Sequence, residues 1–237
     1  MSRARLGSYA LWQLRDYALT RGVPTLIIGA LLLLQMRMIM RAPGAGLMAV
    51  GIVSQLLAPF VVIGALIAIN GIISNDRRQG YYRFLFAKPL SMSRYYVQAF
   101  LLHGAGLVVI SALFLLAVWV VGGSATPART VLYPASFYVL LGGLGFLFSA
   151  LLRTDWVLIV GTLVLTEVLR WRWADDAGPV GWMVRWLLPP FHVFSDMRTT
   201  LLAGSMPQWG SLLWPVLYGG LAVSAGVVVL RKRAMGG

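Results

Sequence analysis

Six long apolar runs constrain this chain more than any other feature of its sequence. The runs cover residues 23–40, 47–73, 95–121, 135–152, 156–173 and 212–230. A helix rises about 1.5 Å per residue, so about 20 apolar residues cross the hydrocarbon core of a bilayer. Hydrophobic residues make up 59% of the 237 residues, which does not suit a water-soluble surface. We therefore expect an all-α integral membrane protein with six transmembrane helices, in a single domain over residues 1–237.

The first 21 residues have a different pattern, in which polar and apolar side chains alternate with helical spacing. One arc of the helical wheel carries Leu6, Ala10, Leu11, Leu14, Tyr17 and Ala18, and the opposite arc carries Arg5, Ser8, Arg15 and Asp16. This pattern predicts an amphipathic helix over residues 1–21 that lies along the membrane interface. The segment lacks the continuous apolar stretch of a cleavable signal peptide.

The stretch before the last apolar run is broken by two prolines. Residues 180–188 and 191–202 are apolar segments on either side of Pro189 and Pro190, and both are too short to cross a bilayer. Non-helical backbone at membrane depth is tolerated where it packs on protein. We therefore expect residues 180–202 to form a re-entrant helical hairpin in the outer leaflet.

Residues 76–88 form a basic and aromatic insert between the second and third runs. The segment carries one acidic residue, Asp76, with Arg77, Arg78, Arg83 and Lys88 and with Tyr81, Tyr82, Phe84 and Phe86. Basic loops stay on the cytoplasmic side of a membrane. A short helix with rings on one side and guanidinium groups on the other would lie at the headgroups or enter a groove on a partner. The alternative is a basic loop that only determines topology.

The distribution of charge predicts the orientation of the whole chain. Lys and Arg number 20 against 7 Asp and Glu, which gives a formal net charge of +13. Most of these basic residues fall on one side if the amino-terminal helix, the 76–88 insert, Arg153 and the carboxyl terminus share it. We therefore expect both termini to be cytoplasmic and the protein to be in the inner, cytoplasmic membrane. The charge then faces anionic lipid headgroups, and no nucleic-acid partner is expected.

No motif of an enzyme active site is present in the sequence. The chain has two histidines and no cysteine, and it lacks both the Gly-x-Ser-x-Gly elbow and the phosphate-binding pattern Gly-x4-Gly-Lys-Ser/Thr. We therefore expect no catalytic, cofactor-binding or metal-binding residues. The chain is not expected to hydrolyse ATP by itself.

Four polar residues interrupt the apolar runs, where a polar group is costly. They are Gln55, Asn70, His103 and Glu167. These side chains are candidates for a translocation path through the bundle, and Glu167 is also a candidate to face a second copy of the chain. The alternatives are a local pair between Glu167 and Arg170, and a role for His103 in helix packing.

One family has a similar sequence around the 76–88 insert. Residues 73–96 contain an acidic residue, a glycine four positions later and a Pro-x-Ser-x-x-Arg pattern, at Asp76, Gly80, Pro89, Ser91 and Arg94. Together with six spans, an interfacial helix and a broken external hairpin, this segment resembles the permease subunits of ATP-binding-cassette exporters of the type 2 class. The chain departs from the family pattern at Tyr81, where a threonine is common, and at Phe84 and Phe86 among the usual leucines.

The resemblance implies a function and a set of partners. Residues 76–88 would be the cytoplasmic coupling helix, which docks into a separate ATPase subunit through Asp76, Arg77, Arg78, Gly80, Tyr81, Arg83 and Phe84. ATP and magnesium would be bound by that ATPase subunit, and a second permease copy would complete the path. The chain would export an amphipathic or hydrophobic substrate such as a lipid, drug or antibiotic. The alternative is a non-transporting membrane assembly factor or scaffold protein.

Overall fold

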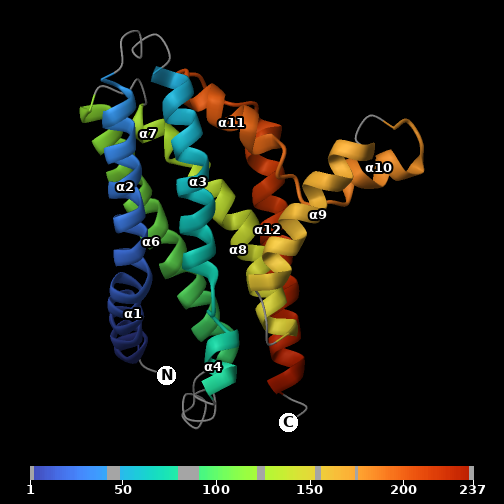
Figure 1. Cartoon of the computed structure of the whole chain (residues 1–237). Helices are drawn as coiled ribbons and strands as arrows, with labels where there is room; N and C mark the ends of the chain where they lie inside the picture. Colours follow the sequence, from blue (N-terminus) through green and yellow to red (C-terminus); the bar gives the residue numbers. More distant parts are fainter. Residues whose placement is uncertain are drawn as a thin grey trace.

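Helices account for every regular element in the described part of the chain. The computed structural model describes residues 3–41, 49–79, 91–121, 126–152, 156–173 and 176–234, and these ranges contain no strand. The elements are α1 (Arg3–Tyr17), η1 (Ala18–Gly22), α2 (Val23–Ile39), α3 (Ala49–Ile69), α4 (Ser74–Gln79), α6 (Met92–Val120), α7 (Pro127–Thr130), α8 (Leu132–Leu151), α9 (Trp156–Trp173), α10 (Pro179–Trp186), α11 (Val193–Leu202) and α12 (Trp209–Ala234). The expected all-α class is confirmed for these residues (Figure 1).

Within the described residues, five helical segments are long and apolar enough to cross a membrane. They are Ala10–Ile39, Ala49–Asp76, Met92–Val120, Pro127–Leu151 and Trp209–Lys232. They correspond to the first four apolar runs and to the last one. The chain therefore has the character of a multi-pass membrane protein.

The sixth expected crossing, over residues 156–173, is not confirmed. Helix α9 has the expected bounds, but its 18 residues include Glu167, Arg170 and Arg172. Each charged side chain in a transmembrane helix is costly, and α9 is not among the five membrane-length apolar segments. Figure 1 shows α9 leaving the bundle and standing out to one side together with α10.

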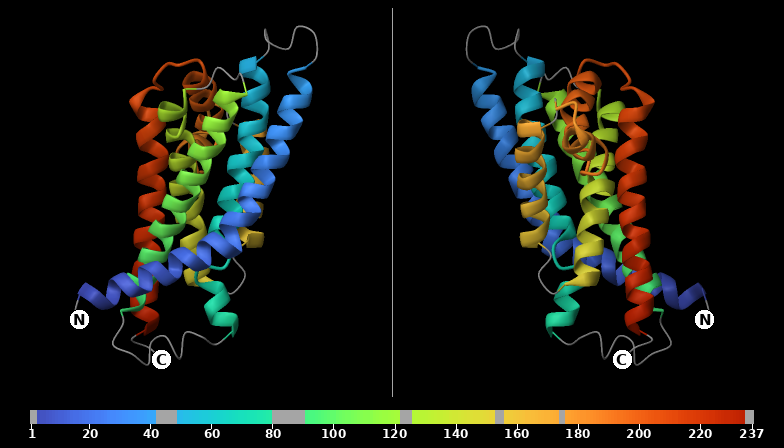
Figure 2. Two further views of the ribbon diagram at one scale, coloured as in Figure 1. Left: turned by 90° about the vertical axis from the view of Figure 1, so that its left-hand side faces the viewer. Right: turned by 90° about the vertical axis from the view of Figure 1, so that its right-hand side faces the viewer.

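The beginning of α1 and the end of α12 lie at the same end of the bundle. Helix α4 lies at this end too, whereas α7 and α11 lie at the opposite end (Figures 1 and 2). The segment from α9 to α11 thus returns the chain from the end of α8 to the beginning of α12. We call the end with α4 and the two termini the foot of the bundle.

The π-helical turn η1 joins α1 to α2, and all three contribute to the first membrane-length segment. Figure 2 shows α1 running across the foot and α2 rising from it. Helix α1 packs against α6, and Gln13 and Tyr17 are buried while Leu11 and Leu14 are exposed. The apolar arc of the helical wheel is therefore not the face that packs on the bundle, apart from Tyr17.

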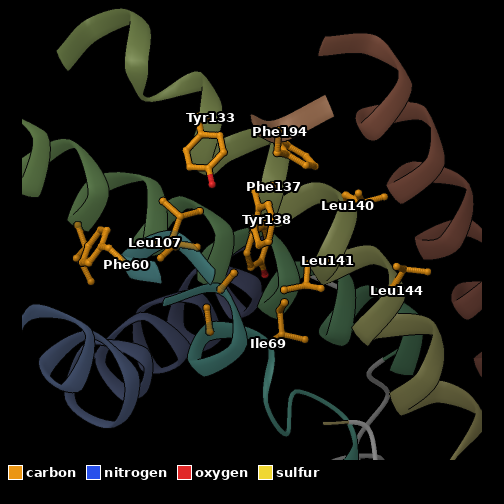
Figure 3. Close-up of a cluster of buried hydrophobic side chains, with 14 of the residues drawn as sticks. Phe60, Ile69, Leu107, Tyr133, Phe137, Tyr138, Leu140, Leu141, Leu144 and Phe194 are labelled. Atoms are coloured by element: carbon orange, nitrogen blue, oxygen red, sulfur yellow. The ribbon is translucent and has the colours of Figure 1, made fainter. Parts of the chain in front are cut away.

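Helix α8 lies at the centre of the bundle, between α3, α6 and α12. Its side chains dominate the buried apolar cluster that Figure 3 shows, with Leu140 and Leu141 almost fully buried. The rings of Tyr138 on α8 and Phe100 on α6 stack with their centroids 5.1 Å apart. Lipid tails are as apolar as these side chains, so close packing and not removal from water holds such helices together.

The contact between α8 and α12 depends on two glycines. A Cβ atom on Gly143 would lie 2.3 Å from the carbonyl oxygen of Gly219, and a Cβ atom on Gly219 would lie 2.1 Å from that of Val139. The two backbones therefore touch at this point, as helices in membranes do where small residues face each other.

Residues 180–202 form two short helices on either side of Pro189 and Pro190, as the sequence predicts. The two helices do not pack together as one hairpin. Helix α10 packs chiefly on α9, whereas α11 packs on α3, α7, α8 and α12. The reason is an aromatic cluster in which Phe194 of α11 lies 5.0 Å from Phe137 and 6.0 Å from Tyr133 of α8, between ring centroids. This cluster holds α11 on the bundle and leaves α10 with α9.

Candidate functional site

Helix α3 ends at a glycine that redirects the chain into α4. Gly71 has φ of +75°, a left-handed conformation that side chains other than glycine rarely adopt. The amide of Asn70 still donates to the carbonyl oxygen of Leu66 at 3.0 Å, and the amide of Asn75 donates to that of Gly71 at 3.4 Å. The joint formed by residues 70–73 therefore separates α3 from α4, which carries the first four residues of the 76–88 insert.

The guanidinium group of Arg21 caps the end of α3. Arg21 lies in η1, and its Nη1 donates to the carbonyl oxygen of Ala68 at 3.0 Å while its Nη2 donates to that of Asn70 at 2.8 Å. The last carbonyl groups of a helix have no partner within the helix, and a cation there complements the helix dipole. Arg21 therefore fastens the amino-terminal segment to the joint.

His103 of α6 lies at the same point. Its Nδ1 is 3.0 Å from the carbonyl oxygen of Ala68, its Nε2 is 3.2 Å from Nη1 of Arg21, and Nδ1 also contacts that nitrogen. The imidazole is buried, with 5% of its surface exposed. Three elements, η1, α3 and α6, thus meet at one guanidinium group.

Tyr17 lies next to the His103 ring. The two ring centroids are 5.0 Å apart, and the Tyr17 ring occupies the space where a Cβ atom of Gly106 would be. The Tyr17 hydroxyl and the Gln13 amide are buried without a hydrogen-bond partner in the described part of the chain. Helix α1 therefore packs closely against α6, next to the contact between Arg21 and His103.

Asp76 links α4 to α6. Its carboxyl group forms a side-chain hydrogen bond with Tyr96, and the positive charge of Arg21 acts on it. We call Arg21, Ala68, Asn70, Asp76 and His103 the foot cluster. Among the other expected ATPase contacts, Arg77 and Arg78 lie in α4, and Gly80, Tyr81, Arg83 and Phe84 lie outside the described residues.

The four candidate path residues have different surroundings. Asn70 and His103 meet through Arg21, whereas Gln55 and Glu167 are exposed on α3 and α9. Gln55 precedes Asn70 by about four turns, which is about 22 Å along a helix. The assignment of these residues to a path remains a prediction.

Glu167 does not satisfy the guanidinium group of Arg170. Glu167 acts on Arg170 through its charge, but Nε and Nη2 of Arg170 are buried and donate no hydrogen bond to any described residue. The arginine side chain is only 8% exposed. A local pair therefore does not account for the burial of Arg170.

Arg21 and Gly71 are not among the residues predicted from the sequence. A glycine near the end of an apolar run is a signal for the end of a helix, and Gly71 lies two residues before the end of the apolar run over residues 47–73. An arginine before an apolar run usually indicates membrane topology. The contact of Arg21 with the end of α3 joins residues that are distant in the sequence, so no local pattern predicts it.

The fold and the foot cluster define an all-helical chain with the character of a multi-pass membrane protein. No family model, no curated protein and no solved structure matches this chain. Its function must therefore be inferred from its residues.

Proposed function

We propose that this chain is the membrane-spanning subunit of an ATP-binding-cassette exporter. In this proposal the chain forms the translocation path as a dimer, is driven by a separate ATPase subunit that binds ATP and magnesium, and exports an amphipathic or hydrophobic substrate. It acts in the inner membrane with both termini in the cytoplasm.

The observation that carries the proposal is the attachment of α4. The segment that resembles a coupling helix begins in α4, and α4 leaves a joint that is tied to η1 by Arg21 and to α6 by the Asp76 and Tyr96 hydrogen bond. A displacement of α4 therefore acts on three parts of the bundle at once. A loop that only determines topology needs no such attachment.

The energy for transport would enter through this segment. A ligand or partner shifts a conformational equilibrium only when it binds the two states with different affinity. The ATPase subunit would therefore have to contact residues 76–88 differently in its ATP-bound and ATP-free states. The foot cluster then passes the displacement to α2, α3 and α6.

Helix α9 supports the participation of a second copy. It stands away from the bundle (Figure 1), and Val164, Leu165 and Val168 are exposed around the exposed Glu167. A carboxylate that faces lipid is costly. A second copy of the chain would cover this face and remove Glu167 from lipid.

The experiment that tests the proposal uses the membrane complex with its ATPase subunit. We expect Gly80→Pro and Arg83→Glu to reduce ATP hydrolysis to the rate of the ATPase subunit alone, because both changes alter the docking segment. The control is Arg15→Glu, which makes the same charge change at an exposed residue of α1. Both docking variants should still insert into the membrane. Substrate-stimulated ATP hydrolysis at the unaltered rate in both would refute the docking assignment.

A further inference from the structure

An apolar groove lies between α2 and α6. Helices α2, α3 and α6 pack against one another, and Figure 1 shows them on the side of the bundle opposite α9 and α10. The groove has a volume of about 230 Å³. Its walls come from one face of α2 between Leu26 and Leu33 and one face of α6 between Ile110 and Ala117, and its base is Phe60 of α3. The groove is thus separate from the face on α9 that a second copy would cover.

Small residues create the space in the groove. Gly29 and Ala30 line it on α2, and Ala117 lines it on α6. Next to Gly29 the rings of Phe60 and Phe114 stack with their centroids 4.1 Å apart, and a Cβ atom on Gly29 would lie 3.1 Å from Phe60. The ring pair closes the groove toward the core, so an occupant enters from the outer surface.

The groove is open to that surface. Leu26 and Leu113 on its two walls are 45% and 53% exposed, so an occupant reaches it without the movement of a helix. Both walls belong to membrane-length segments, Ala10–Ile39 and Met92–Val120. The opening therefore faces the hydrocarbon of the bilayer.

The residues that line the groove are all apolar. A polar group placed among them would lose its hydration without gaining a hydrogen bond. The part of an occupant inside the groove is therefore hydrocarbon. From Leu26 to Leu33 the groove follows α2 for about 10 Å, a shape that suits an extended chain.

A cation lies on α2 beyond the end of the groove. Arg37 follows Leu33 by four residues, and residues four apart share one face of a helix. Leu26, Leu33 and Arg37 therefore form one line along α2. The Arg37 side chain is exposed in the last turn of α2, at the end of the bundle away from the foot (Figure 2).

The length of this line matches one leaflet of a bilayer. Arg37 lies eleven residues after Leu26, which is about 16 Å along a helix. The hydrocarbon core is about 30 Å thick, so one leaflet is about 15 Å. Trp119, near the end of α6, is 56% exposed, and tryptophan favours the boundary between hydrocarbon and headgroups. A headgroup at Arg37 thus has its acyl chain beside the groove.

We propose that the groove holds one acyl chain of an anionic membrane phospholipid whose phosphate binds Arg37. Two phosphate oxygens match the fork of a guanidinium group. The lipid belongs to the leaflet away from the foot and fills the space between α2 and α6. Helix α2 needs such support, because most of its side chains are exposed. The inference requires only a chain in a membrane, so its failure would leave the proposed function untouched.

The test is native mass spectrometry of the purified full chain, released from nanodiscs with equal amounts of phosphatidylglycerol and phosphatidylcholine. We expect the unaltered chain to retain one phosphatidylglycerol molecule. Ala30→Leu should lose it, because the larger side chain fills the groove from an exposed position. Ala225→Leu, the same change at an exposed alanine of α12, is the matched control and should keep the lipid. Equal retention by these two variants would overturn the inference.

The headgroup contact is tested by a second pair of variants. Arg37→Gln should bind phosphatidylglycerol about tenfold more weakly, because it loses charged hydrogen bonds to the phosphate. Arg231→Gln removes the same charge from an exposed position at the foot end of α12 and should leave the affinity unchanged. An affinity of Arg37→Gln equal to that of Arg231→Gln would refute the role of Arg37.

A further measurement uses the unaltered chain and so does not depend on the folding of a variant. Phosphatidylglycerol with a diazirine group in one acyl chain should crosslink mainly to residues 26–33 and 110–117, and the crosslinking should saturate at one lipid per chain. Crosslinks spread evenly over the exposed faces of α2, α6 and α12 would indicate general contact with the bilayer and overturn the site. Equal crosslinking by the phosphatidylcholine analogue would refute the anionic headgroup. Retention of a different amphiphile in place of phosphatidylglycerol would refute the phospholipid.

Discussion

Arg21 is the residue on which the foot of the bundle depends. Its guanidinium group satisfies two carbonyl oxygens at the end of α3 and contacts the His103 ring of α6. Without it, two carbonyl groups at the end of α3 would lose their side-chain donor. The same residue positions the joint from which α4 leaves. We therefore expect Arg21 to contribute both to the stability of the fold and to the proposed transmission of force from α4 to the bundle.

We predict that Arg21→Gln lowers the stability of the purified chain. Hydrogen bonds to a charged group contribute about 1.5–3 kcal/mol each, and glutamine is too short to replace both. Arg21→Lys should be intermediate because a lysine ammonium group lacks the planar fork. Thermal unfolding in detergent measures both changes, with the exposed Arg15→Gln as the control. Equal Tm values for Arg21→Gln and Arg15→Gln would contradict the role of Arg21.

The elements of this protein are held together by close contact between helix backbones. Gly143 and Gly219 let α8 and α12 touch along the longest shared face of the bundle. Helix α8 also packs against α3, α6 and α9. A change in the distance between α8 and α12 would therefore displace α8 and disturb its packing against these other helices.

We predict that Gly219→Ala destabilises the protein, because the new methyl group would lie 2.1 Å from the carbonyl oxygen of Val139. Added volume in a packed core costs about 1–3 kcal/mol. Gly220→Ala is the matched control, because a Cβ atom there has no neighbour within 4 Å. Unfolding of both variants in the same detergent compares them. Equal stability of the two variants would show that α8 and α12 tolerate separation.

The sequence predicted where helices occur better than it predicted how they pack. The apolar run over residues 156–173 predicted the bounds of α9, and Pro189 and Pro190 predicted the break between α10 and α11. Packing depends on contacts between distant residues, such as Phe194 with Phe137, which no local pattern contains. The π-helical turn at Ala18–Gly22 has no local signal either, since Arg21 is held there by carbonyl groups about 50 residues away along the chain.

At the scale of the whole molecule, the passage from α8 to α12 is the least regular part of the bundle. Five segments of the described chain have the length and apolarity of transmembrane helices, and α9 carries three charged residues. Yet α1 begins and α12 ends at the same end of the bundle (Figure 2). The segment from α9 to α11 must therefore cross the height of the bundle, although not as one long apolar helix.

Single cysteines test this topology directly, because the chain has no cysteine of its own. We predict that Ser91→Cys and Arg231→Cys react only with reagents that reach the cytoplasm, and that Ser205→Cys reacts with impermeant reagents from outside. All three residues are exposed. Labelling of Ser205→Cys only by reagents that reach the cytoplasm, the side on which α8 ends, would show that the chain does not cross between α8 and α12 as described.

The proposed function requires residues 76–88 to transmit the action of an ATPase to the bundle. The most direct measurement places a photo-reactive amino acid at Arg83 in living cells and identifies what it crosslinks. The account predicts a soluble protein that hydrolyses ATP, and no such product from a photo-reactive residue at Met206, which is exposed at the opposite end of the bundle. Crosslinks from position 83 to lipid alone, or to proteins that bind no nucleotide, would contradict it.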